Sequence, residues 1–373
     1  MSSWQRLVPL EASSTAVSTE TWRYAPKGGK QIDFPMTVTN GKKFDVLSLK
    51  GTDLQETREY SDFLNETSRK LYDDKSKVVN IQACPCCGAP TAEYCQETDV
   101  FVGVSLSRCQ VCRHGFFSQQ PKEEVLSEVF AESETHSSIY VDMENVDARM
   151  KEIIAPKAQW SLDLYSSLYN AMPRDGIDVG AGGGHFVEGL LRRGVKADGY
   201  EISRASRAFA KKAFDLDLIS DDFLLADGEK ADLITFWGLL EYTPKPRAFL
   251  EAARRMISDK GMLVVEVPRV DCFGTAVQSE NPNSIARHID PTSHVNTFSD
   301  ASLATALVET GFRPVAAWYF GMDVYELLVQ AALRLGDASV IDKLADMVPR
   351  LQHSLDLGRQ CDDLVVAAVP ITD

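Results

Sequence analysis

From residue 176 to the end of the chain, short apolar runs alternate with segments in which apolar residues recur at helical spacing. Each apolar run has the length of a strand, and the segments between them have the length and spacing of amphipathic helices. The apolar runs are 176–181, 195–203, 216–220, 231–238, 261–268, 314–320 and 363–370. This alternation predicts an α/β fold: a doubly wound, Rossmann-like sheet of seven mostly parallel strands with helices on both faces.

The chain before this alternation divides into three segments of different character. Residues 1–80 are polar, rich in Ser and Thr, and without a motif of recognisable chemistry. Residues 81–120 hold a cysteine cluster, and residues 121–172 have helical spacing that predicts a connector. We therefore expect an N-terminal extension of unknown role, a small cysteine module, a helical connector and a main domain over 173–373, with a substrate-side insertion around 271–299.

The composition limits the classes of partner. The chain has 373 residues, 44% of them hydrophobic, so it can bury a sizeable core. Its formal net charge of −15 at pH 7 disfavours binding to nucleic acid or to anionic lipid. The N-terminus has no basic region followed by an apolar run, and no apolar run approaches the about 18 residues of a membrane span. These features predict a cytoplasmic protein that binds neither membrane nor nucleic acid.

Two cysteine pairs predict a metal site. Cys84-x-x-Cys87 and Cys109-x-x-Cys112 supply four thiolates, which is the ligand set of a closed tetrahedral zinc site. The span between the pairs is slightly longer than the usual ~15–20 residues and predicts a ribbon with a long hairpin. With four cysteine ligands and no open position, the Zn²⁺ would be structural, and its binding would supply folding free energy to a module too small to fold unaided.

Other readings of the cysteines stay open. Cys86 could replace a neighbouring ligand, His114 could do so less readily, and Cys95 is spare. A Cys-x-x-Cys pair could instead be a redox motif, although a cluster of this kind in a chain this long favours metal.

A glycine motif follows the first predicted strand of the main domain. Gly180, Gly182 and Gly184 alternate, Asp178 precedes them, and Glu201 ends the next predicted strand. The motif is not a dinucleotide fingerprint, because the sixth position counted from Gly180 is a histidine, and it is not a P-loop, because no Gly-Lys-Ser/Thr follows.

The chemistry of this motif suits one kind of ligand. Alternating glycines remove side chains where a ligand lies against the turn, and a helix N-terminus favours a carboxylate as readily as a phosphate. A carboxylate at the tip of the second strand accepts hydrogen bonds from ribose hydroxyls and repels a 2′-phosphate. S-adenosylmethionine (SAM) carries a ribose and an amino-acid carboxylate but no phosphate, so it fits this pattern.

Residues 176–270 resemble the class I SAM-dependent methyltransferases, and the resemblance extends more weakly to the C-terminus. Residues 231–268 look like the family's fourth strand, a Leu-Glu-His turn, a helix and the fifth strand, with Tyr242 where the family commonly has His. The resemblance implies that SAM contacts, besides the glycine motif, Glu201, Ile202, Asp222 and Phe223 on the adenosine side and Phe236, Trp237 and Leu239 on the methionine side. Phe223 and Trp237 could equally be core aromatics.

The paired cysteines resemble the zinc-binding segment that precedes the catalytic domain in one branch of these methyltransferases, which includes sugar C-methyltransferases. Position 113 is Arg where that branch commonly has Gly. The branch also carries a Tyr-His-Glu-His run that is absent here, so O-methylation is slightly favoured over C-methylation.

Methyl transfer to a hydroxyl requires a group that removes its proton. Residues 293–312 resemble a family segment reading His-x-x-x-Phe-Ser, which matches His294, Phe298 and Ser299. His294 is therefore the first candidate base, although it could equally be a structural loop histidine. Ser299 is better explained as the N-cap of the following helix. Weaker catalytic candidates are Glu241, His288 and Asp290.

The sequence thus predicts a SAM-dependent methyltransferase for a small polar acceptor, such as a sugar or a biosynthetic intermediate. Two alternatives are a zinc-ribbon binding or scaffold protein with a SAM-sensing domain, and a protein or tRNA methyltransferase. The span 88–108 contains one Arg and no Lys, which makes it a poor phosphate binder. The apolar side of a predicted helix at 321–335 suits core packing or a homodimer contact.

Overall fold

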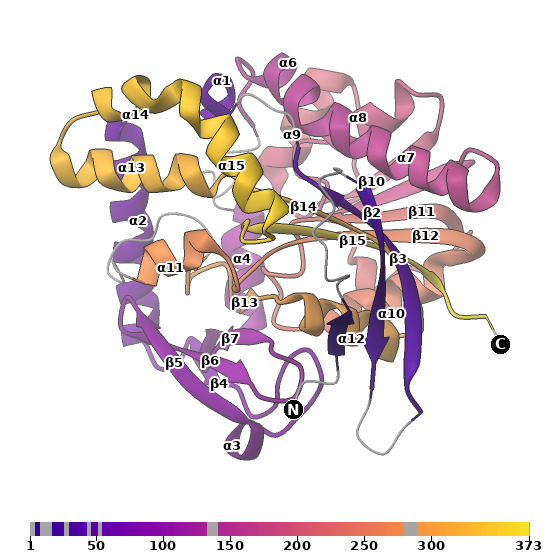
Figure 1. The fold of residues 1–373 in the computed structure, drawn as a ribbon, viewed down its shortest axis with the longest axis horizontal. Helices are drawn as coiled ribbons and strands as arrows, with labels where there is room; N and C mark the ends of the chain where they lie inside the picture. The colour runs from indigo at the N-terminus through magenta and orange to yellow at the C-terminus, as the bar shows by residue number, and fades with distance from the viewer. Residues whose placement is uncertain are drawn as a thin grey trace.

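The computed structural model describes residues 4–7, 17–25, 30–42, 46–50, 54–132, 141–279 and 289–372. One large mixed sheet runs through these residues (Figure 1). Its strand order is β1-β2-β3-β14-β15-β12-β11-β9-β10. The strands are β1 (Trp4–Leu7), β2 (Val17–Tyr24), β3 (Ile32–Asn40), β9 (Asp175–Val179), β10 (Lys196–Tyr200), β11 (Ala231–Trp237), β12 (Ile257–Pro268), β14 (Phe312–Phe320) and β15 (Asp363–Pro370). Strands β10, β9, β11 and β12 are parallel, whereas β15 runs antiparallel to β12 and β14.

The strand count differs from the predicted seven. Six predicted strands form, but the segment 216–220 pairs with the sheet only through Ile219, which bridges to Tyr200. The preceding helix ends at Phe214, Asp215 caps it with a φ of 57°, and the Leu216 amide still bonds back to that helix. Few residues therefore remain to pair. On the opposite edge, the sheet gains β3, β2 and β1.

Helices cover both faces of the sheet, which confirms the doubly wound, Rossmann-like fold. Along β12, Met262 and Val264 face the helices α7 (Ala155–Tyr169) and α8 (His185–Leu191), because side chains alternate between the faces of a strand. Leu263 and Val265 face the other way. The helices on that second face are α10 (Pro246–Met256) and α12 (Asp300–Glu309), and α9 (Arg204–Phe214) follows β10.

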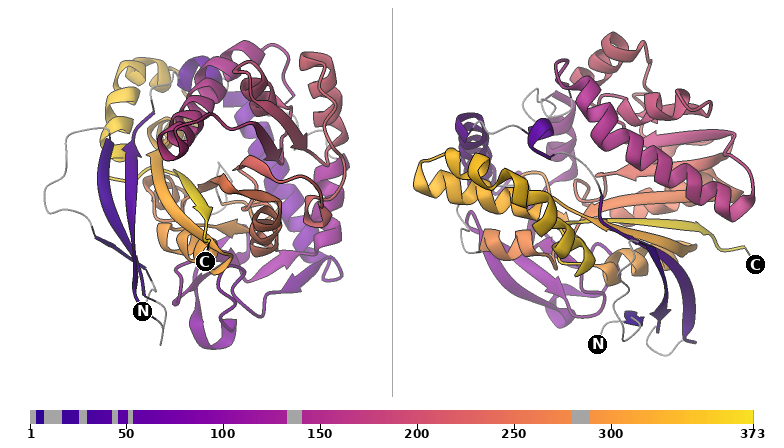
Figure 2. Two further views of the ribbon diagram at one scale, coloured as in Figure 1. Left: turned by 90° about the vertical axis from the view of Figure 1, so that its right-hand side faces the viewer. Right: turned by 45° about the horizontal axis from the view of Figure 1, so that its top comes forward.

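The N-terminal extension contacts both the main sheet and the cysteine module. Strand β3 pairs in parallel with β14, so the indigo β2 and β3 stand at one side of the molecule (Figure 2). The extension continues with α1 (Val46–Lys50) and α2 (Leu54–Asp73). Leu71 and Tyr72 at the end of α2 pack against Phe101 and Phe117 of the cysteine module. The described part of residues 1–80 therefore packs into the main sheet and against the cysteine module.

The cysteine module is a small antiparallel sheet with the long hairpin that the sequence predicts. Its elements are β4 (Val78–Asn80), α3 (Thr91–Tyr94), β5 (Cys95–Phe101), β6 (Val104–Cys109), β7 (Gly115–Phe117) and β8 (Gln119–Pro121). The sheet order is β13-β7-β6-β5, where β13 (Asn296–Thr297) comes from the insertion of the main domain. Strands β4 and β8 form a separate pair.

The remaining helices connect these parts. The predicted connector holds α4 (Glu123–Glu132), then α6 (Val146–Arg149) and a π-helical turn (Met150–Ile154) that leads into α7. The others are a 3₁₀ turn (Phe223–Leu225), α11 (Phe273–Ser279), α13 (Asp323–Leu335), α14 (Ser339–Leu344), a second 3₁₀ turn (Ala345–Met347) and α15 (Val348–Leu357). Helix α13 packs Val324 and Leu328 against Val46 and Ile341, so its apolar side serves a core. Among the described residues, no helix combines the length and the apolar character needed to cross a bilayer.

Candidate functional site

The glycine motif forms the turn between β9 and α8. Gly180, Gly182 and Gly184 have φ values of 72°, 52° and 76°, which glycine adopts readily and other residues rarely do. A Cβ at Gly180 would lie 3.0 Å from Leu239 Cδ1, and one at Gly184 would lie 3.1 Å from Ala210 Cβ. Both the backbone conformation and the lack of space therefore require glycine in this turn.

Glu201 joins this turn to the next strand. Its Oε2 accepts a hydrogen bond from the Gly182 amide at 2.7 Å, and its Oε1 accepts one from the Ser203 amide at 2.7 Å. Burial raises the pKa of Glu201, while the Ser203 and Gly182 amides act in the opposite direction. The glycine motif and the acidic residue that the sequence analysis paired are thus one hydrogen-bonded unit at the carboxyl edge of the sheet.

Asp178 lies on β9, just before the glycine turn, and its register partner on β11 is Thr235. Its carboxylate is buried and accepts a hydrogen bond from the Thr235 hydroxyl at 2.7 Å. Burial raises the pKa of Asp178 to about 7. The side chain therefore supports the base of the glycine turn, and its contact with a cofactor stays a prediction.

The residues expected near adenine surround the tip of β10. Phe223 is buried with its ring edge-to-face against Tyr200, at a centroid distance of 5.2 Å. Asp222 is exposed, and its Oδ1 accepts a hydrogen bond from the Leu224 amide at 2.9 Å. Ile202 is 43% exposed. The structure thus brings these residues together beside Glu201 and adds Tyr200, which the sequence analysis did not single out.

Phe236 and Trp237 point to opposite faces of the sheet. Phe236 is fully buried against Phe223 and Phe249, so it is a core aromatic and does not line an open site. Trp237 is half-buried on the α8 face, where its ring centroid lies 5.0 Å from that of Phe186. The indole Nε1 of Trp237 is buried and has no hydrogen-bond partner within the described ranges.

An ion pair that the sequence analysis missed lies beside Trp237. Lys157 Nζ on α7 is 2.6 Å from Glu266 Oε1 and 4.7 Å from the centroid of the Trp237 ring. Trp237 and Glu266 are register partners at the tips of β11 and β12. The Oε2 atom of Glu266 has no partner among the residues that the structure describes. The available signal for this site was Glu266, the one charged residue in the apolar run 261–268.

Glu241 lies in the turn after β11. Its carboxyl group is buried, its Oε1 lies 3.1 Å from the position of a Cβ at Gly238, and its Oε2 has no partner in the described part of the chain. Burial raises the pKa of Glu241 to about 8, and Glu266 and Asp363 act in the same direction. The side chain is therefore largely protonated near neutral pH, in a position close to the tip of β11.

His294 lies next to this turn. It is half-buried and packs edge-to-face on Tyr242, with ring centroids 4.6 Å apart. Two residues further on, the Asn296 amide donates to the Glu241 carbonyl at 3.2 Å. The two predicted catalytic residues, His294 and Glu241, are thus carried by adjacent segments.

The other candidates on this segment have structural partners. Asp290 accepts hydrogen bonds from the Thr292 amide at 2.8 Å and from the Thr292 and Ser293 hydroxyls. Ser299 caps α12 in a capping box with Ser302, as expected for an N-cap. His288 lies outside the described residues.

Lys42, from the N-terminal extension, reaches the same edge of the sheet. Its Nζ lies 4.9 Å from the centroid of the Phe320 ring at the end of β14. Burial lowers the pKa of Lys42 to about 7, and nearby Lys157 acts in the same direction. The composition of residues 1–80 gave no signal for this placement.

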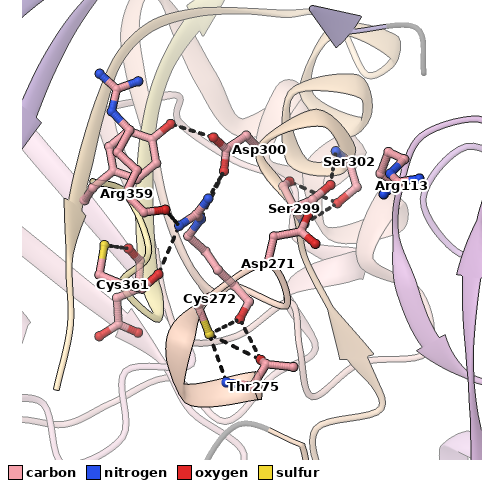
Figure 3. Close-up of polar contacts among 12 residues, drawn as sticks. Arg113, Asp271, Cys272, Thr275, Ser299, Asp300, Ser302, Arg359 and Cys361 are labelled. Atoms are coloured by element: carbon pink, nitrogen blue, oxygen red, sulfur yellow. Dashed lines mark hydrogen bonds and ion pairs between the residues drawn. The ribbon is translucent and has the colours of Figure 1, made fainter. Parts of the chain in front are cut away.

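A second polar cluster holds the end of the insertion in place (Figure 3). Arg269, just past β12, donates from Nη1 to the carbonyls of Arg359 at 2.7 Å and Cys361 at 3.0 Å, and from Nε to Asp300 Oδ1 at 3.0 Å. The Cys272 thiol donates to the Arg269 carbonyl at 3.1 Å. These bonds tie the starts of α12 and β15 to the end of β12.

The four cysteines of the predicted metal site converge. The Sγ atoms of Cys84, Cys87, Cys109 and Cys112 all lie within 4.8 Å of one another. The closest sulfur pairs join the two knuckles: Cys84 to Cys112 at 3.6 Å and Cys87 to Cys109 at 3.7 Å. These separations exceed a disulfide bond and suit four thiolates around one ion.

The backbone of each cysteine knuckle has the same turn. The Gly88 amide bonds to the Cys84 carbonyl at 2.9 Å, and the Arg113 amide bonds to the Cys109 carbonyl at 3.0 Å. Gly88 has a φ of 70° and Arg113 a φ of 68°, so Arg113 adopts the conformation that favours glycine. Cys86 is not one of the four converging thiols, and its own thiol donates to the Ser302 carbonyl at 3.1 Å.

Comparison with known proteins agrees with this geometry. Residues 149–317 match the methyltransferase domain family. The chain therefore carries a class I SAM-dependent methyltransferase domain, preceded by a four-cysteine module.

The individual relatives are distant. The ubiquinone biosynthesis O-methyltransferase of Alkalilimnicola ehrlichii is 27% identical over 96 residues, which are 24% of this chain and 39% of that protein. The chain thus spans about two fifths of the length of the curated relatives it matches.

Two solved structures are similar at lower identity. The plantazolicin methyltransferase BamL is 15% identical with a TM-score of 0.44, and the similarity covers 67% of this chain and 96% of that one. The magnesium protoporphyrin IX methyltransferase of Synechocystis PCC 6803, solved with bound SAH, is 13% identical with a TM-score of 0.45, and covers 67% and 100%.

Proposed function

We propose that this protein is a SAM-dependent methyltransferase that methylates a hydroxyl oxygen of a small polar molecule and holds one structural Zn²⁺. The proposal is carried by two features of the carboxyl edge of the sheet: the Glu201 carboxylate bound to the Gly182 amide after β9, and three buried polar atoms near the tips of β11 and β12 that have no partner within the described residues. The first feature suits the cofactor, and the second suits an acceptor.

The glycine turn and Glu201 suit the adenosine and methionine parts of SAM. Glu201 would accept hydrogen bonds from the ribose hydroxyls, with Ile202, Asp222 and Phe223 beside the adenine. Gly180, Gly182 and Gly184 leave the backbone open to the methionine part, with Trp237 and Leu239 on its far side. Bound SAM would supply a methyl group that is already activated for displacement.

The acceptor side is lined by acidic groups. The unpartnered atoms are Glu241 Oε2, Glu266 Oε2 and Trp237 Nε1, which lie at or just after the tips of β11 and β12. Two carboxyl groups beside an aromatic ring suit a ligand that presents several hydrogen-bond donors. This arrangement supports a hydroxylated or amino-bearing acceptor, of which a sugar is one example.

His294 and Glu241 are the candidates for the proton transfer, because adjacent segments carry them near the tip of β11. The acceptor hydroxyl would lose its proton as its oxygen takes the methyl group. We assign this role to His294, with Glu241 as a hydrogen-bonding partner of the acceptor. The name of the distant relatives, which are O-methyltransferases, agrees with transfer to oxygen.

The cysteine cluster suits structural Zn²⁺. Four buried or half-buried sulfurs converge within 4.8 Å of one another, and as thiolates they would repel one another unless a cation neutralised them. All four positions of a tetrahedral ion would be filled, so this ion would stabilise the module and leave the reaction to the other site.

A methyl-transfer assay tests the proposal. The purified protein is incubated with methyl-labelled SAM and a panel of hydroxylated acceptors, namely sugars, nucleotide sugars and phenols. We expect label in one acceptor class and a fall of about 10²-fold or more in kcat for His294→Ala, the usual scale for loss of a general base. Transfer to a protein or to tRNA, with none to small molecules, would contradict the proposed acceptor class.

A further inference from the structure

The strand β13 belongs to the sheet of the cysteine module although it lies in the insertion of the main domain. Asn296 pairs with Phe116, and Thr297 pairs with Gly115. A Cβ at position 115 would lie 2.3 Å from Thr297 Oγ1, so only glycine allows the two strands to approach this closely. The module and the methyltransferase domain therefore share a sheet.

The segment before β13 is held against the module as well. The Phe117 amide donates to the Val295 carbonyl at 3.2 Å, and Gln120 Nε2 donates to the same carbonyl at 3.0 Å. The Tyr72 hydroxyl donates to the Pro291 carbonyl at 2.7 Å. His294 is thus flanked on both sides by residues that bond to the module or to α2.

Asn296 connects the module to the turn that carries Glu241. It is fully buried, its Nδ2 donates to the Thr243 carbonyl at 2.6 Å, and its backbone amide donates to the Glu241 carbonyl at 3.2 Å. Its Oδ1 lies 3.0 Å from His114 Nε2. Because Nδ2 already donates to Thr243, Oδ1 accepts, and His114 donates from Nε2.

His114 follows the second cysteine knuckle, is fully buried and is not one of the four converging metal-ligand candidates. Its ring packs edge-to-face on Phe298 at a centroid distance of 4.7 Å and is stacked against Phe116 at 6.0 Å. The Cys109 amide bonds to the His114 carbonyl at 2.9 Å. The knuckle therefore fixes the ring that in turn fixes the Asn296 side chain.

We propose that Asn296 is a positioning residue: together with His114, it holds the turn 239–243 and the neighbouring His294 in register with the glycine turn. This role rests on the proposed function, because it assumes that the turn 239–243 and His294 line the acceptor side of that site. The cysteine module would then support the acceptor side from behind. The module then acts in positioning the acceptor side, while the cofactor side, built from β9 and β10, is independent of it.

The contacts that run from the cysteine knuckle through His114 and Asn296 to the turn 239–243 are called the relay below. Three variants and one control test this relay. His114→Phe keeps an aromatic ring against Phe298 but removes the donor, Asn296→Ala removes the amide, and His114→Gln restores a donor. Glu97→Ala, at an exposed position on β5, is the matched control. The measurements are zinc per chain by atomic emission, SAH affinity by calorimetry, and hydrogen exchange of residues 239–243 and 293–297.

We expect His114→Phe and Asn296→Ala to speed exchange in both segments about fivefold or more, the scale of one lost hydrogen bond. Zinc content and SAH affinity should stay at the wild-type values, and His114→Gln should restore slow exchange. With an acceptor in hand, kcat should fall in the first two variants while the KM for SAM stays the same.

Unchanged exchange in both disconnecting variants would overturn the relay. Loss of zinc from both would also overturn it, since the bond would then hold the module together rather than position the turn. Absence of SAH binding by the wild-type protein would instead refute the proposed function, so the two failures are distinguishable.

Discussion

Glu201 accepts a hydrogen bond from the amide of Gly182 across the step from β9 to β10, at 2.7 Å. This contact ties the acidic tip of one strand to the glycine turn that follows its neighbour. Its geometry requires a residue of positive φ at position 182 and a carboxylate at position 201. Substitution of Glu201 therefore tests the proposed cofactor site most directly.

Replacement of Glu201 by Ala should weaken SAH binding by about 1–3 kcal/mol, because charge-assisted hydrogen bonds to the ribose would be lost. Isothermal calorimetry measures this difference. Glu188→Ala, on the neighbouring helix α8, is the control and should bind SAH as the wild type does. Equal affinity of Glu201→Ala and wild type would remove Glu201 from the cofactor site.

Glu241 should make stability depend on pH. In the unfolded chain its carboxyl group titrates near 4.5, whereas burial raises its pKa in the folded protein to about 8. Between these values the folded state binds the extra proton, so this group's contribution to stability falls as pH rises from about 4.5 to about 8. Glu241→Gln removes that loss.

The test compares urea unfolding of wild type and Glu241→Gln at several pH values. The free energy of unfolding of the variant, relative to wild type, should increase steadily from pH 5 to pH 8 and level off above it. A pH-independent difference would show that Glu241 ionises normally. Asp178 and Asp356, whose pKa values are also raised by burial, are present in both proteins and cancel in the comparison.

The cysteine assignment predicts which thiols the metal needs. Cys109→Ser should abolish stoichiometric zinc and lower the melting temperature, because binding free energy of the ion is folding free energy of the module. Cys86→Ala should keep one zinc per chain, since the Cys86 thiol bonds to the Ser302 carbonyl and is not one of the four thiols that converge. Atomic emission measures the zinc content per chain of both variants. Equal loss of zinc from both would contradict the assignment of Cys84, Cys87, Cys109 and Cys112 as the ligands.

Arg113 should be a site where glycine is tolerated or preferred. Its φ of 68° is costly for a residue with a Cβ, and its side chain is exposed. Arg113→Gly should therefore leave zinc content unchanged and stabilise the module by up to about 1 kcal/mol. Thermal unfolding compared with Arg108→Gly, on the preceding strand, measures this; equal destabilisation by both changes would contradict it.

The parts of the site that the sequence predicted are local in the chain. The glycine turn, Glu201 and the two cysteine knuckles each depend on residues a few positions apart, and the chemistry of the residue types limits their use. Most of the secondary structure in the main domain was also predictable. Helices and strands that bury one face repeat apolar residues with a fixed period, and this period is visible in the sequence.

The features that the sequence did not predict depend on contacts between segments that are far apart in the chain. Neither the addition of β3 beside β14 nor the pairing of Asn296 with Phe116 leaves a local pattern. The Lys157–Glu266 pair joins residues 109 positions apart, and Lys42 comes from an extension whose composition signals nothing. The sequence predicted a full strand at 216–220, but only Ile219 pairs with the sheet. The apolar pattern of this segment does not show where the preceding helix ends.

Native mass spectrometry of the purified protein, with and without S-adenosylhomocysteine, tests the central claim most directly. We predict that the chain carries one zinc ion and gains one saturable nucleoside adduct, and that Glu201→Ala needs a higher concentration of the nucleoside to reach the same occupancy. A wild-type chain that carries zinc but never the adduct would contradict the proposed methyltransferase and would favour a scaffold role for the fold.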